Sequence, residues 1–204
     1  MGALKKNKLQ TTSGRPSDAS VSEAIAKGNA LTKGSLFVFG LGNILNKQIV
    51  RGLIFLAIEI AYIVYMATFG VRAIGNFMTL GTNEQGQTYN EALGIYEYTA
   101  GDNSMLFLLY GVITIVLTLA VIFMACMSAK SAYCTQLRRE RGMHIPGFLD
   151  DLRSLREENI HTGLLALPII GIIIFTIVPL IFMILIAFTS YDHEHQPPGN
   201  LFGW

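Results

Sequence analysis

The chain has 204 residues, of which 51% are hydrophobic and 14% are charged. An average soluble domain carries ~25% charged residues, so this composition argues against an ordinary soluble domain and favours a membrane protein. The formal net charge of +1 is less informative than the way in which the charges are distributed along the chain.

Residues 1–35 form a polar tail that we expect to be disordered and cytoplasmic. Lys5, Lys6 and Lys8 are not followed by an apolar stretch, which excludes a signal peptide. The tail has few basic residues and no aromatic residues between them, so nucleic-acid binding is not expected.

Residues 36–51 are predicted to form a short amphipathic helix that lies in the membrane interface. Its apolar residues recur at helical spacing, and its polar and basic residues fall elsewhere. The apolar set is Leu41, Ile44, Leu45 and Ile49, and the polar set is Asn43, Asn46, Lys47 and Arg51. We expect the apolar face to point into the membrane and the basic residues to point toward the lipid headgroups.

The first transmembrane helix is predicted at residues 52–71, and a polar extracellular loop is predicted at 72–104. The span contains one acidic residue, Glu59, and an ionisable residue inside a membrane is a functional candidate by default. The same carboxyl group can instead anchor the helix to a neighbour by hydrogen bonding, which is the interpretation we favour because no second intramembrane charge is present to form a relay.

The second transmembrane helix is predicted at residues 105–129, a stretch of 25 residues without a charge. Residues 130–162 follow as a basic cytoplasmic connection, and a helix is predicted to begin near Pro146. Phe148, Leu152 and Leu155 share one face of that helix, which favours a position along the membrane or against a partner.

The third transmembrane helix is predicted at residues 163–190, which run for 28 residues without a charge. About 20 apolar residues already cross a hydrocarbon layer of ~30 Å. Pro168 and Pro179 lie inside this span as candidate kinks. The kinks can suit helix packing, or they can allow movement; both interpretations stay open. Residues 191–204 are predicted to begin a second extracellular loop.

The distribution of Lys and Arg orients the chain. Residues 1–51 contain eight, the 72–104 loop one, the 130–162 connection six, and the segment after residue 190 none. Segments rich in Lys and Arg stay in the cytoplasm. The sequence therefore predicts an all-α polytopic protein of the cell membrane with three spans, a cytoplasmic N-terminus and an extracellular C-terminal end.

The sequence contains no pattern that indicates an enzyme. We find no nucleophile–base arrangement and no phosphate-binding fingerprint, and we expect no catalytic residues, cofactor or metal. His193 and His195 lack a third ligand at a suitable spacing, so this stretch is interpreted as a solvated loop. Cys126 and Cys134 are expected to be reduced thiols near the cytoplasmic face.

Three stretches resemble the larger membrane subunit of maltose/maltodextrin ABC importers. They are GNILNKQIVRGLIFLAIEI, LREENIHTGLLALP and IVPLIFMILIAFTSYDHEHQPPGNLFGW, and the last is the most specific. The resemblance covers most of residues 36–204 and implies a permease subunit. It also implies as partners a second permease subunit, a cytoplasmic ATPase dimer and an extracellular sugar-binding protein, in addition to membrane lipid.

The chain departs from that family in one respect. The cytoplasmic Glu-Ala-Ala…Gly loop that docks the ATPase is absent, and so are the later helices that line the sugar path. We therefore expect an N-terminal portion of a permease that is inactive in transport by itself. The alternative hypothesis is a small self-contained three-span membrane protein that acts as an interaction or assembly factor through Glu59 and the 130–162 helix.

Overall fold

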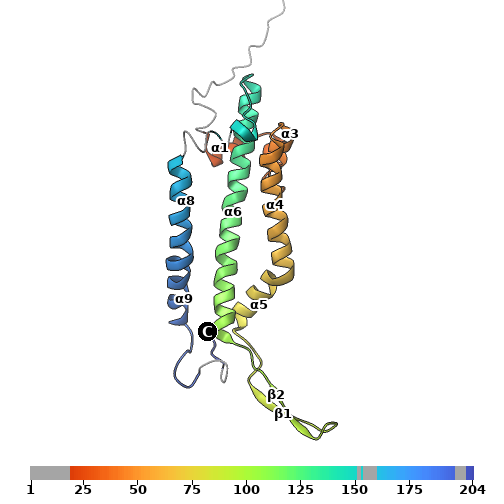
Figure 1. Ribbon diagram of the computed structural model, residues 1–204, viewed down its shortest axis with the longest axis vertical. Helices are drawn as coiled ribbons and strands as arrows, with labels where there is room; N and C mark the ends of the chain where they lie inside the picture. The colour runs from red at the N-terminus through yellow and green to blue at the C-terminus, as the bar shows by residue number, and fades with distance from the viewer. Residues whose placement is uncertain (1–18, 151–152, 154–159, 196–200) are drawn as a thin grey trace, which may run out of the picture. The chain divides into compact units, whose positions relative to one another are not determined.

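The computed structural model describes residues 19–150, 153, 160–195 and 201–204. It is mostly helical, and three of its helices are long and apolar enough to cross a membrane. These candidate spans are Ile49–Thr79, Ser104–Glu140 and Leu164–Ile186. The predicted helical fold with three candidate spans is therefore confirmed (Figure 1). The chain divides into two compact units, Met1–Leu56 with Ala125–Phe148 and Ala57–Met124 with Leu149–Trp204.

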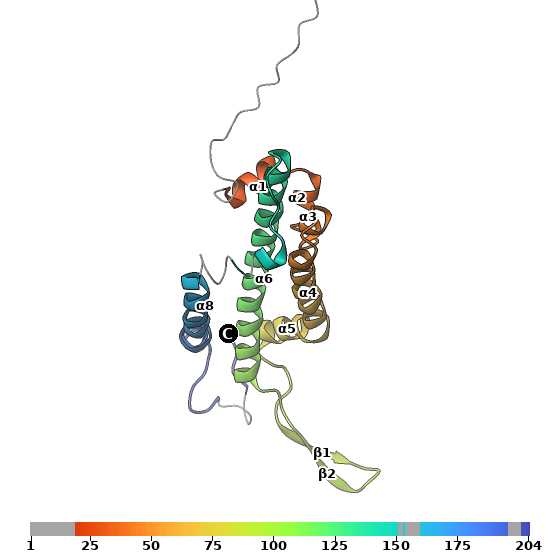
Figure 2. The same cartoon turned by 45° about the horizontal axis from the view of Figure 1, so that its top comes forward.

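The first candidate span is longer than the predicted residues 52–71. It consists of α4 (Ile49–Tyr65), a π-helical turn (Met66–Gly70) and α5 (Val71–Thr79). The chain bends at the π-helical turn (Figures 1 and 2), where the Thr68 hydroxyl donates to the carbonyl oxygen of Val64 at 2.8 Å. The helix continues past Arg72 because Ala73 is buried and Phe77 packs against the core.

The predicted 72–104 loop contains regular structure. Besides α5, it holds an antiparallel hairpin of β1 (Gly86–Asn90) and β2 (Ile95–Thr99), in which Gly86 pairs with Thr99 and Asn90 with Ile95. Gly94 has a φ of 64°, the left-handed conformation that the turn requires. This hairpin was not predicted from the sequence.

The second candidate span, α6 (Ser104–Glu140), continues eleven residues beyond its predicted end at Ala129. The extension is helical because one of its faces is buried, at Ala132, Tyr133 and Thr135. Of the helix predicted from Pro146 onward, residues 148–150 and 153 are helical, and the other positions after Asp150 lie outside the described residues.

The first unit also contains three short helices, which contact the end of α6 (Figure 2). They are α1 (Val21–Lys27), α2 (Ala30–Gly34) and α3 (Leu41–Leu45). Ser20 and Glu23 form a capping box at the start of α1, and Asn29 caps α2. Residues 19–35 thus differ from the predicted disordered tail, and residues 1–18 of that tail lie outside the described part.

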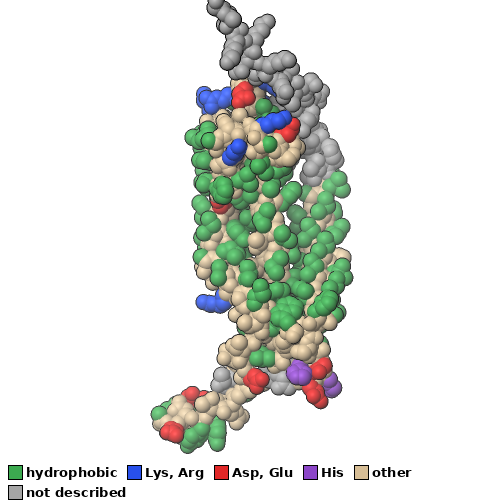
Figure 3. All heavy atoms as spheres, turned by 180° about the vertical axis from the view of Figure 1, so that it is seen from behind, with side chains coloured by type: hydrophobic (Ala, Val, Ile, Leu, Met, Phe, Trp, Pro, Cys, Tyr) green, Lys and Arg blue, Asp and Glu red, His purple; other side chains and the backbone are tan. Residues whose placement is uncertain are grey.

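The third candidate span consists of α8 (Ile160–Ile172), a π-helical turn (Ile173–Ile177) and α9 (Val178–Ile186). Residues 187–190, which were predicted to belong to the span, form a turn. The described span, Leu164–Ile186, contains no buried residue. Apolar side chains cover the sides of the helices on the face seen in Figure 3, a surface that suits lipid or further helices and not water.

The core of the second unit is formed by Leu80, Leu108, Val112 and Phe202. Phe202 is buried, and the Trp204 ring lies edge-on to Phe77 with ring centroids 5.2 Å apart. Residues 201–204 therefore dock against the helices of the second unit, within the stretch 191–204 that was predicted to begin an extracellular loop.

Candidate functional site

The segment between α3 and α4 turns its polar side chains inward. Asn43, Asn46 and Gln48 are buried, whereas Leu45 and Ile49 are about half exposed. The sequence placed Asn43 and Asn46 away from the apolar positions, and the structure buries both. The Asn43 Nδ2 group and both polar atoms of the Asn46 amide have hydrogen-bond partners within the first unit, which offsets part of the cost of burying them. The buried Asn43 Oδ1 has no partner among the described residues.

Gln48 lies at the centre of this buried network. Its Oε1 accepts hydrogen bonds from Asn43 Nδ2 at 3.0 Å and from Thr135 Oγ1 at 2.9 Å. Its Nε2 donates to the carbonyl oxygen of Pro146 at 3.0 Å. Asn43 Nδ2 also donates to Ser131 Oγ at 2.7 Å. Side chains from three separated parts of the sequence are therefore held together by polar contacts.

Further hydrogen bonds fix the segment that precedes α3. The backbone N–H of Gly40 donates to Ser128 Oγ at 2.7 Å, and that of Gly42 donates to Ser35 Oγ at 2.7 Å. At the next turn of α6, Arg139 Nη1 donates to Asn46 Oδ1 at 3.2 Å. These contacts make the first unit a polar clamp around residues 128–139, which is how we refer to it below.

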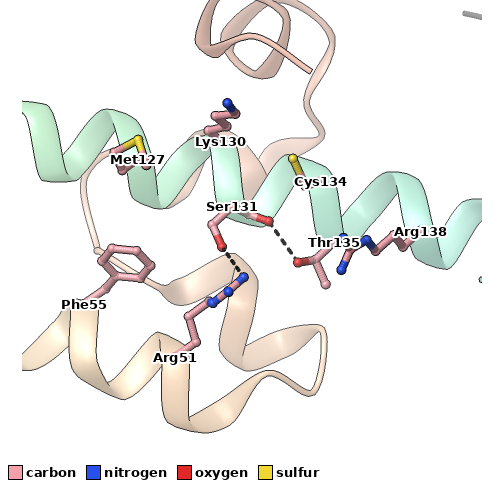
Figure 4. Close-up of a pocket in the computed structure, with 8 residues that line it drawn as sticks. All are labelled: Arg51, Phe55, Met127, Lys130, Ser131, Cys134, Thr135 and Arg138. Carbon is pink, nitrogen blue, oxygen red and sulfur yellow. Dashed lines mark hydrogen bonds between the residues drawn. The ribbon is translucent and has the colours of Figure 1, made fainter. Parts of the chain in front are cut away.

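A cavity of about 300 Å³ opens beside the polar clamp (Figure 4). Its lining combines three basic residues, two hydroxyl residues, a thiol and two apolar residues. These are Arg51, Lys130 and Arg138, then Ser131 and Thr135, then Cys134, and finally Phe55 and Met127. Arg51 reaches from α4 toward α6, where its Nη1 donates to Ser131 Oγ at 3.4 Å. We refer to this as the basic cavity.

The residues singled out from the sequence lie elsewhere. Glu59 is half-buried in α4. Pro168 lies inside α8 and Pro179 in the first turn of α9, both exposed, so they flank the π-helical turn Ile173–Ile177. Glu59 thus belongs to a different helix from the two prolines, and its anchoring role stays a prediction.

The histidine stretch after the third span is organised by Asp192. Asp192 Oδ1 accepts hydrogen bonds from the backbone of His195 at 2.8 Å and from its Nδ1 at 2.7 Å. The hydrogen bond to the His195 side chain, followed by that to its backbone, lowers the pKa of Asp192. In the described part of the chain, no group of three or more His, Cys, Asp or Glu side chains is placed to hold a metal ion.

The polar clamp and the basic cavity were not found from the sequence, although a signal is present. Ser128, Ser131 and Thr135 recur at helical spacing along one face, immediately after an uncharged apolar run. In a helix that leaves the membrane, such a stripe of small polar residues marks a surface for hydrogen bonding to other segments. Asn43 and Gln48, which hydrogen-bond to this stripe, lie within residues 36–51. That segment was interpreted as an interfacial helix from the spacing of its apolar residues, so its polar residues were not examined as a contact surface.

The second unit uses the same type of contact between α4 and α6. Tyr65 Oη and Thr114 Oγ1 are 2.8 Å apart, and Tyr62 Oη donates to Thr118 Oγ1 at 3.0 Å. Thr114 is fully buried. Tyrosine and threonine pairs therefore join the two antiparallel helices in the middle of their apolar runs.

Comparison with known proteins decides the broad assignment. Over 166 residues, which are 81% of this chain, it is 30% identical to the maltodextrin transport system permease protein MalC of Streptococcus pneumoniae. Over the same length it is 25% identical to the maltodextrin transport system permease protein MdxF of Bacillus subtilis. It is 24% identical to the galactooligosaccharides transport system permease protein GanP of that organism. The chain is similar to oligosaccharide-transport permeases, as the sequence predicted.

These permease relatives are considerably longer. The chain spans about 35% of the length of the curated relatives that it matches. No family model and no solved structure matches the chain. The similarity to transport permeases and the three apolar helices together support a multi-pass membrane protein of the transport class.

Proposed function

We propose that the chain is part of a permease subunit that imports maltodextrin-type oligosaccharides. The observation that carries the proposal is the similarity, over 81% of the chain, to two maltodextrin permeases and a galactooligosaccharide permease. The three apolar helices support the same class of function, because a permease needs membrane-spanning helices to surround the path of its substrate.

The orientation and the partners belong to this proposal. The bias of Lys and Arg toward residues 1–51 and 130–162 favours a cytoplasmic N-terminus and an extracellular C-terminal end. We propose a second permease subunit, a cytoplasmic ATPase dimer and an extracellular sugar-binding protein as partners. ATP hydrolysis then takes place on the ATPase subunits, and this chain is a transport subunit without catalytic residues.

Uptake by cells tests the proposal. In the source organism, disruption of the gene for this chain is expected to abolish uptake of labelled maltotriose and longer maltodextrins, and to leave glucose uptake unchanged. Labelled galactooligosaccharides are the informative comparison, because one relative carries that name. Loss of galactooligosaccharide uptake with normal maltodextrin uptake would reassign the sugar, and normal uptake of both would refute the permease proposal.

A further inference from the structure

The basic cavity brings cationic side chains together on two helices of the first unit. Lys130 and Arg138 lie two turns apart on α6, and Arg51 belongs to the first turn of α4; each contributes to the lining of the cavity. The Lys130 side chain is directed away from Arg51 (Figure 4). All three side chains are half-buried. Holding like charges at a partly desolvated site is unfavourable unless an anion compensates them.

The lining of the basic cavity contains no acidic side chain among the described residues. In the same part of the chain, the side chains of Lys130 and Arg138 have no hydrogen bond or ion pair to a protein group. Ser131 and Thr135 add hydroxyl groups to the wall. The Thr135 hydroxyl already donates within the protein, to Gln48 Oε1 and the Ser131 carbonyl oxygen, so the Ser131 hydroxyl is the donor to consider. A cavity with several cations and a hydroxyl donor is chemically suited to a phosphate group.

The remaining lining residues indicate where such a phosphate group comes from. Phe55 lies one turn further into the first candidate span than Arg51, and Met127 lies one turn further into the second than Lys130. The cavity is therefore cationic toward the helix ends and apolar toward the spans. A phospholipid has the same polarity, with a phosphate headgroup above acyl chains, whereas a soluble phosphate has no apolar part to place there.

We propose that the basic cavity binds the phosphate headgroup of an anionic phospholipid. Lys130 and Arg138 supply the attraction, Ser131 donates a hydrogen bond, and Phe55 with Met127 contacts the upper part of an acyl chain. The site holds the lipid against the polar clamp, so that an occupied site tightens the first unit. This inference does not depend on which sugar, if any, the protein transports.

The test measures lipid binding to the whole chain, purified in detergent with bound lipid removed. Titration with phosphatidylglycerol, followed by native mass spectrometry, is expected to show tighter binding than titration with phosphatidylcholine. The variant Lys130→Gln/Arg138→Gln is expected to weaken phosphatidylglycerol binding by about 10-fold or more, because each basic residue at a membrane surface contributes about a fivefold factor in affinity. Binding of phosphatidylcholine is expected to stay the same.

The control variant Lys33→Gln/Arg153→Gln removes two exposed positive charges and leaves the cavity intact. Equal weakening by both double variants would overturn the proposal, because general surface charge would then explain the binding. Displacement of the lipid by inorganic phosphate at low millimolar concentration would overturn the lipid assignment in favour of a soluble anion. Thermal unfolding in phosphatidylcholine checks that both variants are folded, and Met127→Ala provides a second, charge-neutral test that should weaken phosphatidylglycerol binding.

Discussion

Single residues decide how closely the segments of the first unit approach. Gly40 has a φ of 77°, and its backbone lies against the backbone of Gly52. A Cβ atom at Gly40 would overlap with Gly52, and the left-handed conformation disfavours any L side chain. Gly40 therefore serves both as a turn and as a point of close contact.

We predict that Gly40→Ala destabilises the protein by more than ~1 kcal/mol. The matched control is Gly75→Ala, at a helical position of α5 where an added Cβ meets open space. That control should be neutral or stabilising by up to ~1 kcal/mol, since alanine favours helix. Thermal unfolding in lipid nanodiscs compares the two variants, and equal effects would contradict the role assigned to Gly40.

The buried amide of Gln48 is the second residue with a large expected effect. Gln48→Leu removes the acceptor shared by Asn43 and Thr135 and leaves Asn43 with one hydrogen bond fewer. The expected loss is about 1–3 kcal/mol of unfolding free energy. Gln87→Leu, on the exposed hairpin, is the control and should change stability by less than ~0.5 kcal/mol. A denaturant titration that shows no difference would refute the importance of the network.

At the level of elements, two of the three spans contain a π-helical turn. In the third span, the N–H of Val178 donates to the carbonyl oxygen of Ile173, five residues earlier. Pro179 follows directly and has no N–H to offer to the carbonyl oxygen of Phe175. We attribute the π-helical turn to Pro179, because the proline removes one backbone hydrogen-bond donor from the helix.

Pro179→Ala is predicted to restore a regular α-helix at Ile173–Ile177. The new N–H at residue 179 should exchange slowly in nanodiscs, because it donates to the carbonyl oxygen of Phe175. Pro168→Ala, in α8, is the control, and its effect should be confined to the turn before residue 168. Rapid exchange of the new N–H at residue 179 in Pro179→Ala would contradict a local proline effect and indicate that packing imposes the turn.

The hairpin is closed at its base by Asp102. Its Oδ2 accepts hydrogen bonds from the backbone N–H groups of Thr82 at 2.9 Å and Asn83 at 3.0 Å. These bonds, that of Thr82 first, lower the pKa of Asp102 below its ordinary value. A lowered pKa means that the carboxylate stabilises the folded hairpin above the unfolded value of ~3.9 and loses this effect as pH falls through the folded pKa.

The amide NMR signals of Thr82 and Asn83 are therefore predicted to shift on acidification, with a midpoint below ~3.9. In Asp102→Asn the same signals should no longer titrate, because that side chain carries no charge at any pH. A midpoint at or above the ordinary carboxyl value would show that the two backbone hydrogen bonds do not stabilise the carboxylate.

On the scale of the whole molecule, the proposed topology is open to a direct test. In a background of Cys126→Ala and Cys134→Ala, a cysteine at Gln87 should react with a membrane-impermeant maleimide in intact cells. A cysteine at Lys33 should react only after permeabilisation, because the basic segments are expected in the cytoplasm. The reverse labelling pattern would show that the protein has the opposite orientation in the membrane.

The sequence by itself was enough to predict the membrane character, the three candidate spans and the similarity to transport permeases. Long uncharged runs have one stable solution, a helix in lipid, because backbone polar groups must be satisfied within the segment. The stretches around Gly42–Ile60 and Ile177–Trp204 carried the resemblance to permeases that the comparisons confirm. The capping box of Ser20 and Glu23 is also visible in the sequence and indicates the start of a helix. The tail was nevertheless predicted to be disordered, because its overall composition is polar.

The tertiary structure alone decided which polar residues face inward. Ser131 accepts a hydrogen bond from Asn43 Nδ2 and Thr135 donates one to Gln48 Oε1, across almost 90 residues of sequence. These bonds favour burial of Asn43 and Gln48, and the local periodicity of the sequence does not predict such distant pairs. The same holds for the basic cavity, whose cations come from two helices. Helical spacing predicts which residues share a face, but only the packing of separate segments decides whether that face meets lipid, water or another helix.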